Sequence, residues 1–447
     1  MFSCVVIESS FDQGERLQAP GSLWFNFCFH DFFNDTISLL FCLIFLYLKY
    51  SCLFDSEHIE RAPELNPSDE CWYLPLFGIY HPQKKDSIRG VFDSSATFCG
   101  QSLNKVLMTG PDLMNTLLGV LLRFRKEAFA LMTDIEQMLY CFKVIPDHRK
   151  YLRFIWHEDN CFEKPLVDYQ MRVHVFGNSP SPSIASYGLR RTADQSESKF
   201  GSDVKAFVHR NFYVDDALPS HPTADETIDL LNRTKAGLQE YGNLRLHKIS
   251  SNSDIVLSAF ATEDLSKDFK DLELGKECLP TQRSLGVCWN LHSDEFTFRV
   301  TIEDKPFTRR GVLSSINSLF DPLGLTAPVT IAEKSLLREA MTGNRDWDAP
   351  LPSDYETRWE KWKTSLRELE NLVIPRMYSN MPLTQATSKE LNIFCDASET
   401  AIAAVAYTHL TDSSEHQRLG FILGKANLLP NMDTLYQGLN CVRRFGN

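Results

Sequence analysis

Two short apolar runs that each end in aspartate place the strongest constraint on the fold of this 447-residue chain. One run, "ALMTDIEQM", contains Asp134, and the other, "HRNFYVDDALPSH", contains the adjacent pair Asp215 and Asp216. The second run predicts a strand from Phe207 to Val214. Adjacent carboxylates repel each other, so the pair either lies solvated in a hairpin turn or holds a cation. If the two strands are neighbours in one sheet, three carboxylates meet at one edge, and divalent metal would make that cluster tolerable.

Carboxylates together with substrate phosphates are the usual ligands of Mg²⁺. Two such ions about 3.5–4 Å apart activate a hydroxyl group and stabilise a leaving pyrophosphate in line with it. The aspartate pattern therefore predicts a metal site for phosphoryl transfer, with Asp134, Asp215 and Asp216 as the ligands.

The overall charge does not exclude a nucleic-acid partner. The chain has a net charge of −12, which taken alone argues against nucleic-acid binding. From residue 71 to residue 250, however, 22 Lys and Arg stand against 20 Asp and Glu, so the acidity lies elsewhere. A length of 447 residues and 43% apolar content indicate two or three globular domains with a large core.

Cysteine and hydropathy patterns favour a protein with reduced thiols and no membrane span. The 12 cysteines include no C-x-x-C pair, which argues against a local zinc site and against a disulfide framework. The uncharged stretch "ISLLFCLIFLYL", residues 37–48, is shorter than the roughly 20 residues that a spanning helix needs. We therefore expect no membrane association for this segment.

Several further elements follow from periodicity and from turn residues. Residues 111–125 predict a helix that begins at a proline, and residues 151–156 and 171–176 predict strands. Thr223 and Glu226 form a capping box for a helix that Gly242 ends, and a strand follows at "NLRLHKI". Trp72, Trp156 and Trp289 are expected in the core rather than as base-stacking platforms. Residues 1–70 show no clear period.

The order and spacing of these blocks resemble the reverse transcriptases of the Pao/BEL group of LTR retrotransposons. The resemblance runs from about Trp72 to about Pro430. It rests on "WYLPLFGIYHP", "IRGVFDSSA", "SLNKVLMTGPDL", "MTDIEQM", "RVHVFGNSPSPSIA", "FYVDDAL", "NLRLHKISSN", "RSLGVCWN", "FTRRGVLSSINSLFDPLGLTAPV" and "FCDASETAIAAVAY".

The resemblance implies an α/β (α+β) fold: a right-hand polymerase with fingers, palm and thumb, followed by a partial RNase H-like sheet. On this basis, residues 71–250 are expected to form fingers and palm, 251–385 the thumb and connection, and 386–447 a truncated RNase H-like domain. Residues 1–70 do not resemble the family and are expected to be poorly ordered. The family further implies two Mg²⁺ or Mn²⁺ ions, an RNA or DNA template-primer, dNTPs as substrates and a cytoplasmic, particle-associated location.

The resemblance also assigns roles to individual residues. Asp134, Asp215 and Asp216 match the metal-binding aspartates, and Lys248 matches a lysine that protonates pyrophosphate. Arg89 matches an arginine that grips the incoming triphosphate, with Lys85 or Lys84 as its companion. Simpler alternatives exist, since Arg89 could form a surface ion pair and Lys248 could be an exposed strand lysine.

The nucleotide pocket of the family supplies further candidates. Phe176 and Gly177 match a loop that lines this pocket, although they could equally form a simple turn. Leu139 stands five residues after Asp134, where the family usually carries an aromatic ring that blocks a ribose 2′-OH. We expect weaker selection against ribonucleotides, unless Tyr140 swings into the gap or Leu139 is a core residue one position out of register. Side chains alternate along a strand, so Tyr140 is expected to point away from Leu139. Residues 285 and 286 resemble the primer grip.

At the C-terminal end, Asp396 in "FCDAS" matches the first catalytic aspartate of RNase H, but the next block of that family is missing. We therefore expect a vestigial RNase H-like sheet without activity. Two functions stay open at this stage. One is an RNA- and DNA-directed DNA polymerase, and the other is an inactive, truncated retroelement remnant that at most binds nucleic acid.

Overall fold

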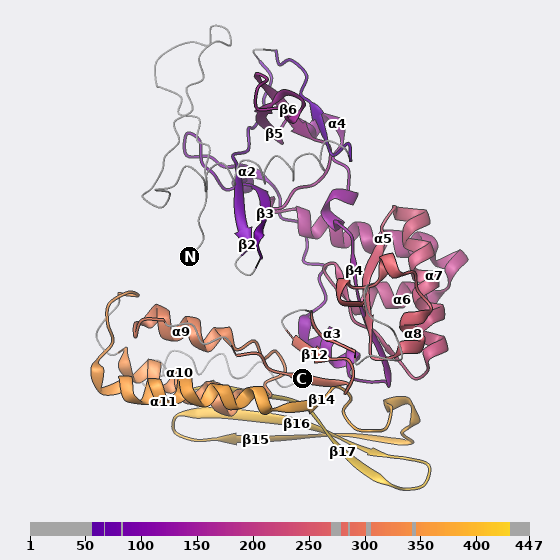
Figure 1. Cartoon of the computed structure of the whole chain (residues 1–447), viewed down its shortest axis with the longest axis vertical. Coiled ribbons are helices and arrows are strands. Elements are labelled where there is room, and N and C mark those ends of the chain that lie inside the picture. The colour runs from indigo at the N-terminus through magenta and orange to yellow at the C-terminus, as the bar shows by residue number, and fades with distance from the viewer. Residues whose placement is uncertain are drawn as a thin grey trace. The chain divides into compact units, whose positions relative to one another are not determined.

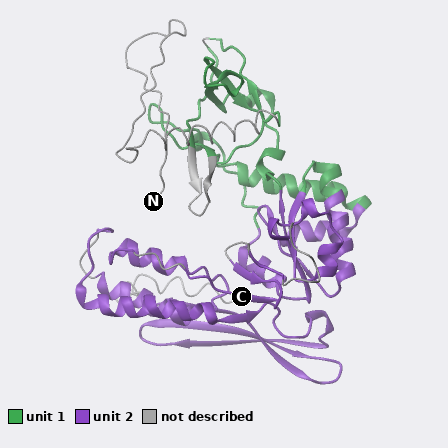
Figure 2. Cartoon of the chain, viewed as in Figure 1, with its two compact units in different colours: residues 1–114, 136–199, 237–245 green, residues 115–135, 200–236, 246–447 purple. Residues whose placement is uncertain are grey.

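The computed structural model describes residues 56–66, 68–81, 84–269, 279–284, 287–300, 305–341 and 346–429. The apolar stretch 37–48 lies outside them, and within these ranges no helix is long and apolar enough to cross a membrane. The chain divides into two compact units, coloured separately in Figure 2. The first unit comprises residues 1–114, 136–199 and 237–245, and the second comprises 115–135, 200–236 and 246–447.

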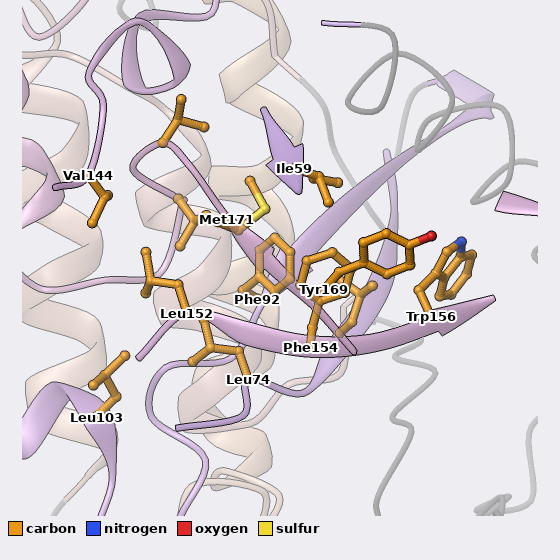
Figure 3. Close-up of a cluster of buried hydrophobic side chains, with 13 residues drawn as sticks. Ile59, Leu74, Phe92, Leu103, Val144, Leu152, Phe154, Trp156, Tyr169 and Met171 are labelled. Carbon is orange, nitrogen blue, oxygen red and sulfur yellow. The ribbon is translucent and has the colours of Figure 1, made fainter. Parts of the chain in front are cut away.

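The first unit is built around a small antiparallel sheet in the order β1-β6-β5, next to a β2–β3 hairpin. Figure 3 shows the aromatic core that these strands share. The ring of Phe154 stacks on that of Tyr169 at a centroid distance of 5.9 Å and meets the ring of Phe92 edge-on at a centroid distance of 5.2 Å. The elements of this unit are β1 (Ile59–Arg61), β2 (Leu76–His81), β3 (Lys84–Phe92), α2 (Leu103–Val106), η1 (Met138–Cys141), α4 (Pro146–Arg149), β5 (Arg153–His157), η2 (Glu158–Asn160), β6 (Leu166–Met171) and most of α5 (Ser181–Phe200).

The second unit contains a five-stranded sheet in the order β10-β4-β8-β7, with β9 also paired to β4. Helices α3 and α6 both contact β7, and Figure 1 shows α6 and α7 on one side of β4. The elements of this part are α3 (Leu117–Phe124), β4 (Phe129–Ile135), α6 (Ser202–Asn211), β7 (Phe212–Tyr213), β8 (Asp216–Ala217), β9 (Ser220–His221), α7 (Ala224–Gly242, which ends in the first unit), β10 (Leu246–Ser251), α8 (Asp254–Ser258), η3 (Thr262–Asp264) and η4 (Lys267–Phe269).

The remainder of the second unit holds two further antiparallel sheets and a helical cluster. Figure 1 shows α10 and α11 running along the three-stranded sheet β15-β16-β17. The elements are β11 (Thr281–Ser284), β12 (Val287–Asn290), β13 (Glu295–Thr297), α9 (Arg309–Ser318), α10 (Ala327–Ala340), η5 (Ser353–Tyr355), α11 (Glu356–Leu366), η6 (Arg367–Asn371), β14 (Val373–Pro375), η7 (Leu383–Gln385), β15 (Ser388–Ala397), β16 (Ala401–Thr411) and β17 (Gln417–Leu428).

A fully buried arginine joins the sheets of the second unit. Arg376 donates to both carboxylate oxygens of Asp294, at 2.7 and 2.8 Å, and to the backbone carbonyl groups of Phe124, Glu127 and Ala128. Arg125 donates in turn to the carbonyl oxygen of Arg376 at 2.8 Å and to a carbonyl of β17 at 2.7 Å. These charge-assisted bonds compensate the cost of burying both guanidinium groups, and they tie the start of β4 to the C-terminal sheets.

Several predicted elements differ from those observed. The strand expected from Phe207 to Val214 is helical up to Asn211 and extended only at Phe212–Tyr213. The helix expected over 111–125 covers only Leu117–Phe124, and the strand expected over 171–176 ends at Met171. A short apolar run does not distinguish strand from buried helix, so contacts between α6, α3 and β7 decide the first case.

Other predictions are confirmed. The Oγ1 of Thr223 accepts a hydrogen bond from the backbone N–H of Glu226 at 3.2 Å, and α7 ends at Gly242. Trp156 and Trp289 are buried, and Trp72 is partly buried against the core in Figure 3. Each cysteine in the described ranges is a free thiol, as the spacing indicated.

Candidate active site

A row of four residues crosses the five-stranded sheet and includes two of the three predicted aspartates. Asp134 of β4 pairs with Asp216 of β8 on one side and with His247 of β10 on the other, and Asp216 pairs with Tyr213 of β7. Directly paired residues project from the same face of a sheet. The expected pairing of the two aspartate-bearing strands is therefore found, and it brings the Asp134 and Asp216 side chains to one face.

The next row of the same sheet explains why the aspartates lie on the open face. Thr133 pairs with Ala217, and Ala217 pairs with Phe212, and all three side chains are buried. Because side chains alternate along a strand, the neighbouring row projects to the opposite, less buried face. Asp134 and Asp216 are accordingly only partly buried.

Asp215 lies in the tight loop between β7 and β8. The loop consists of Val214 and Asp215, since Tyr213 pairs with Asp216. Val214 has a φ of 58°, which is an outlier for a β-branched residue and fits the first position of a primed hairpin turn. The carbonyl oxygen of Asp215 accepts a hydrogen bond from the N–H of Ile135 at 3.0 Å, which fixes the loop against β4. Backbone strain of this kind is concentrated at functional sites in proteins.

Two basic groups flank the carboxylate of Asp134. The Nζ of Lys248 forms an ion pair with Oδ2 of Asp134, and Nε2 of His247 lies 3.7 Å from the same oxygen. Partial burial raises the pKa of Asp134, but the interactions with His247 and Lys248 outweigh it and hold the pKa below its usual value. Asp134 is therefore ionised at neutral pH.

An irregularity in β10 directs Lys248 to this position. The register of β10 against β4 shifts between His247 and Ser250, and Lys248 has a φ of 51°. A bulge of this type re-aims a side chain that would otherwise point to the opposite face from His247. The two neighbouring basic residues consequently both approach Asp134.

The donor set suits a hard divalent cation. Mg²⁺ prefers carboxylate oxygens and is commonly held by one or two of them together with water and substrate phosphates. In the described part of the chain, no group of three or more His, Cys, Asp and Glu side chains is arranged to hold a metal ion. The pair Asp134–Asp216 supplies two carboxylates opposite each other, and Lys248 occupies the Oδ2 side of Asp134.

Phe176 and Gly177 lie in the first unit, on a loop held by Asn104. Gly177 has a φ of 107°, and a Cβ atom there would lie 2.4 Å from the carbonyl oxygen of Phe92. Asn104 donates to the carbonyl oxygen of Gly177 at 2.8 Å and accepts from the N–H of Ser179 at 2.8 Å. The glycine is thus required by contact with Phe92, whereas the ring of Phe176 is 42% exposed.

Leu139 lies in the 3-10 helix η1 and is buried. The expectation that Leu139 and Tyr140 alternate along a strand is therefore wrong. Tyr140, the next residue, meets the ring of Phe176 edge-on at a centroid distance of 6.1 Å. Of these two residues, Tyr140 is the one in ring contact with the Phe176 loop.

The other candidates are placed less fully. Arg89 and Lys85 belong to β3, but their side chains lie outside the described part, as do residues 285 and 286. Asp396 lies on β15 opposite Ala403, is exposed, and accepts a hydrogen bond from the N–H of Ala397 at 2.9 Å. β15 is an outer strand of its sheet, and it exposes Leu391, Ile393 and Phe394.

Sequence reasoning missed His247. His247 stands beside the predicted Lys248, but its role depends on the register of β10 against β4, which no local pattern reveals. A strand would point Tyr140 away from Leu139, but the segment Met138–Cys141 is a 3-10 helix. A short 3-10 helix carries no strong sequence signal, so this error follows from local ambiguity.

Comparison with known proteins gives one sequence match, in the C-terminal part of the chain, and one structural match, to the fold of a solved protein. Residues 308–435 match a family model described as a Pao retrotransposon-like RNaseH-like domain. Among solved structures, the foamy viral protease-reverse transcriptase dRH in complex with double-stranded DNA matches with a TM-score of 0.51 at 14% identity. The match covers 88% of this chain and 58% of that chain, so this chain spans less than two thirds of its length. A search of curated proteins gives no match. Residues 308–435 are therefore similar to a retrotransposon RNase H-like domain, and the fold of the chain is similar to that of a retroviral protease-reverse transcriptase.

Proposed function

We propose that the protein is a reverse transcriptase of a Pao-type retroelement, an RNA- and DNA-directed DNA polymerase that extends a primer 3′-OH with dNTPs. The observation that carries the proposal is the pairing of Asp134 with Asp216 on the open face of the five-stranded sheet, with Asp215 in the adjoining strained turn. The match of residues 308–435 to a retrotransposon domain and the fold likeness to a protease-reverse transcriptase support it. The fingers, palm and thumb arrangement is part of this proposal.

Asp134, Asp215 and Asp216 would hold two Mg²⁺ or Mn²⁺ ions, which activate the primer hydroxyl and stabilise the leaving pyrophosphate. The carboxylate of Asp134 would exchange the ammonium group of Lys248 for metal. Lys248, which the bulge in β10 places beside Asp134, would be the proton donor to the pyrophosphate. Arg89 and Lys85 would grip the triphosphate, and Phe176 and Gly177 would line the nucleotide pocket.

Primer extension on poly(rA)·oligo(dT) with Mg²⁺ or Mn²⁺ tests the proposal. The full chain should incorporate dTTP, and Asp134→Asn and Asp216→Asn should each abolish incorporation. Asp354→Asn, an identical change at an exposed residue of η5, serves as the matched control and should leave the rate unchanged. Absence of extension by the parent chain with either metal would refute polymerase activity.

A second candidate function is nucleic-acid binding without catalysis. It is favoured by the ion pair between Lys248 and Asp134, which neutralises a metal ligand, and by the absence of a three-residue metal cluster among the residues described. The solved neighbour is a complex with double-stranded DNA, which supports a duplex as the ligand. Duplex binding that persists without any primer extension would identify this alternative.

A further inference from the structure

Helix α6 leads directly into the hairpin that carries Asp215 and Asp216. Its last residue is Asn211, and β7 begins at Phe212. The final carbonyl groups of a helix have no partner within the helix, so they need donors from elsewhere. How these carbonyl groups are held therefore fixes the start of the hairpin.

A single side chain spans the junction. The Nδ2 of Asn115 donates to the carbonyl oxygen of His209 at 3.0 Å and to that of Phe212 at 2.7 Å. The first of these carbonyls belongs to the helix and the second to the strand. One amide group thus fixes the angle at which the chain leaves α6 and enters β7.

Neighbouring carbonyl groups are held in the same way. Arg123 of α3 donates to the carbonyl oxygen of Arg210, and the N–H of Leu218 donates to that of Asn211 at 3.1 Å. Residues 209–212 therefore each have a donor. Among them, Asn115 is the group that holds both the helix and the strand.

The edge position of β7 makes this contact important. In the sheet order β10-β4-β8-β7, β7 pairs with β8 and stands at the end of the row. β7 and β8 each contain only two residues, so their ladder is short. The strained Val214 adds an opposing cost at the tip of the loop. A short, strained hairpin keeps a single geometry only where its surroundings hold it.

We propose that Asn115 is a positioning residue that sets the geometry of the Asp215–Asp216 hairpin for metal-dependent catalysis. It does so by donating both protons of its amide group to carbonyl oxygens at the junction of α6 and β7. This inference rests on the proposed polymerase function for its kinetic consequence, whereas its structural part stands independently.

Three substitutions separate hydrogen bonding from shape. Asn115→Leu keeps a similar volume without donors, Asn115→Asp places an acceptor against two carbonyl oxygens, and Asn115→Gln keeps the donors. Displacement of catalytic groups by about 1 Å costs roughly 100-fold in rate. We expect the maximal rate of dTTP incorporation to fall about 100-fold in the Leu and Asp variants, and to stay within about tenfold of the parent in the Gln variant. Template-primer affinity should not change, and the Mg²⁺ concentration for half-maximal rate should rise.

Hydrogen exchange on the same proteins tests the positioning role without relying on activity. Exchange should accelerate across residues 212–217 in the Leu and Asp variants and stay unchanged in β10, which does not pair with the hairpin and so shows that the fold is retained. Asn371→Asp, an exposed change at a side chain that donates to Glu368 at 3.3 Å, is the matched control. If Asn115→Leu leaves exchange across 212–217 unchanged, or accelerates it equally throughout the sheet, the inference is wrong. Failure of the parent chain to extend primers would refute the proposed function while the exchange comparison still decides the role of Asn115.

Discussion

Replacement of Glu333 by glutamine should stabilise the protein at neutral and alkaline pH. Glu333 lies on α10, is 2% exposed, and its Oε1 has no hydrogen-bond partner among the described residues. It is one helical turn from both Val329 and Leu337, which pack in the cluster that contains Trp359 and Trp362. The carboxyl group is therefore held in apolar surroundings, where its charged form is costly.

Burial raises the pKa of Glu333 from 4.5 to about 7, with the charge of Arg358 opposing the shift. A raised pKa means that the folded state binds the proton more tightly than the unfolded state, so stability falls as pH rises from 4.5 to 7. A shift of this size corresponds to about 3 kcal/mol. This is a substantial part of the free energy of unfolding of a typical domain, which is on the order of 10 kcal/mol.

The assay is urea unfolding of the parent and Glu333→Gln at matched pH values, followed by tryptophan fluorescence. At pH near 4 a protonated carboxyl and an amide are similar, so the two proteins should differ little, whereas near pH 8 the variant should be more stable by about 3 kcal/mol. Glu356→Gln, at an exposed position on α11, is the control and should show a difference of under about 1 kcal/mol at every pH. If the free energies of unfolding of the parent and the variant differ by the same amount near pH 4 and near pH 8, the claim that Glu333 is a buried carboxyl group with a raised pKa is wrong.

Four further outcomes can be checked. Asp215→Asn should abolish primer extension while template binding, measured by fluorescence anisotropy, stays nearly intact, because the change removes an acidic side chain and not a basic group that would contact phosphate. We expect no cleavage of the RNA strand of a hybrid, and cleavage that Asp396→Asn abolishes would contradict this. If Leu139 is the residue that faces the ribose 2′-OH, Leu139→Phe should raise the ratio of kcat/KM for dTTP to that for UTP by about 10- to 200-fold. If Tyr140→Ala instead changes this ratio more, by lowering it, Tyr140 has that role. Gly177→Ala should destabilise the protein in thermal unfolding by about 1–3 kcal/mol, because its Cβ would meet the carbonyl oxygen of Phe92, and an unchanged Tm would show that the loop can shift.

The sequence predicted that Asp134 and Asp216 would meet if the strands that carry them pair, but the pairing itself joins segments about 80 positions apart. Side chains alternate along a strand, so direct pairing of Asp134 with Asp216 puts both carboxylates on one face. Asp134 follows the buried Thr133, and Asp216 precedes the buried Ala217, so both aspartates reach the same face once the strands pair. The cap at Thr223 was also predictable, because it depends on residues three positions apart.

Other features depend on contacts between distant segments, and no local pattern predicts them. The run that begins at Phe207 is helical because α6 packs against α3, and its pattern alone does not distinguish a helix from a strand. Val214 and Lys248 have positive φ angles, which their residue types rarely adopt, so local sequence does not predict them. The contacts of Asn115 and Arg376 join segments about 95 and 250 positions apart in the chain. Local sequence thus set which faces are buried, and long-range hydrogen bonds set where the charged groups come to lie.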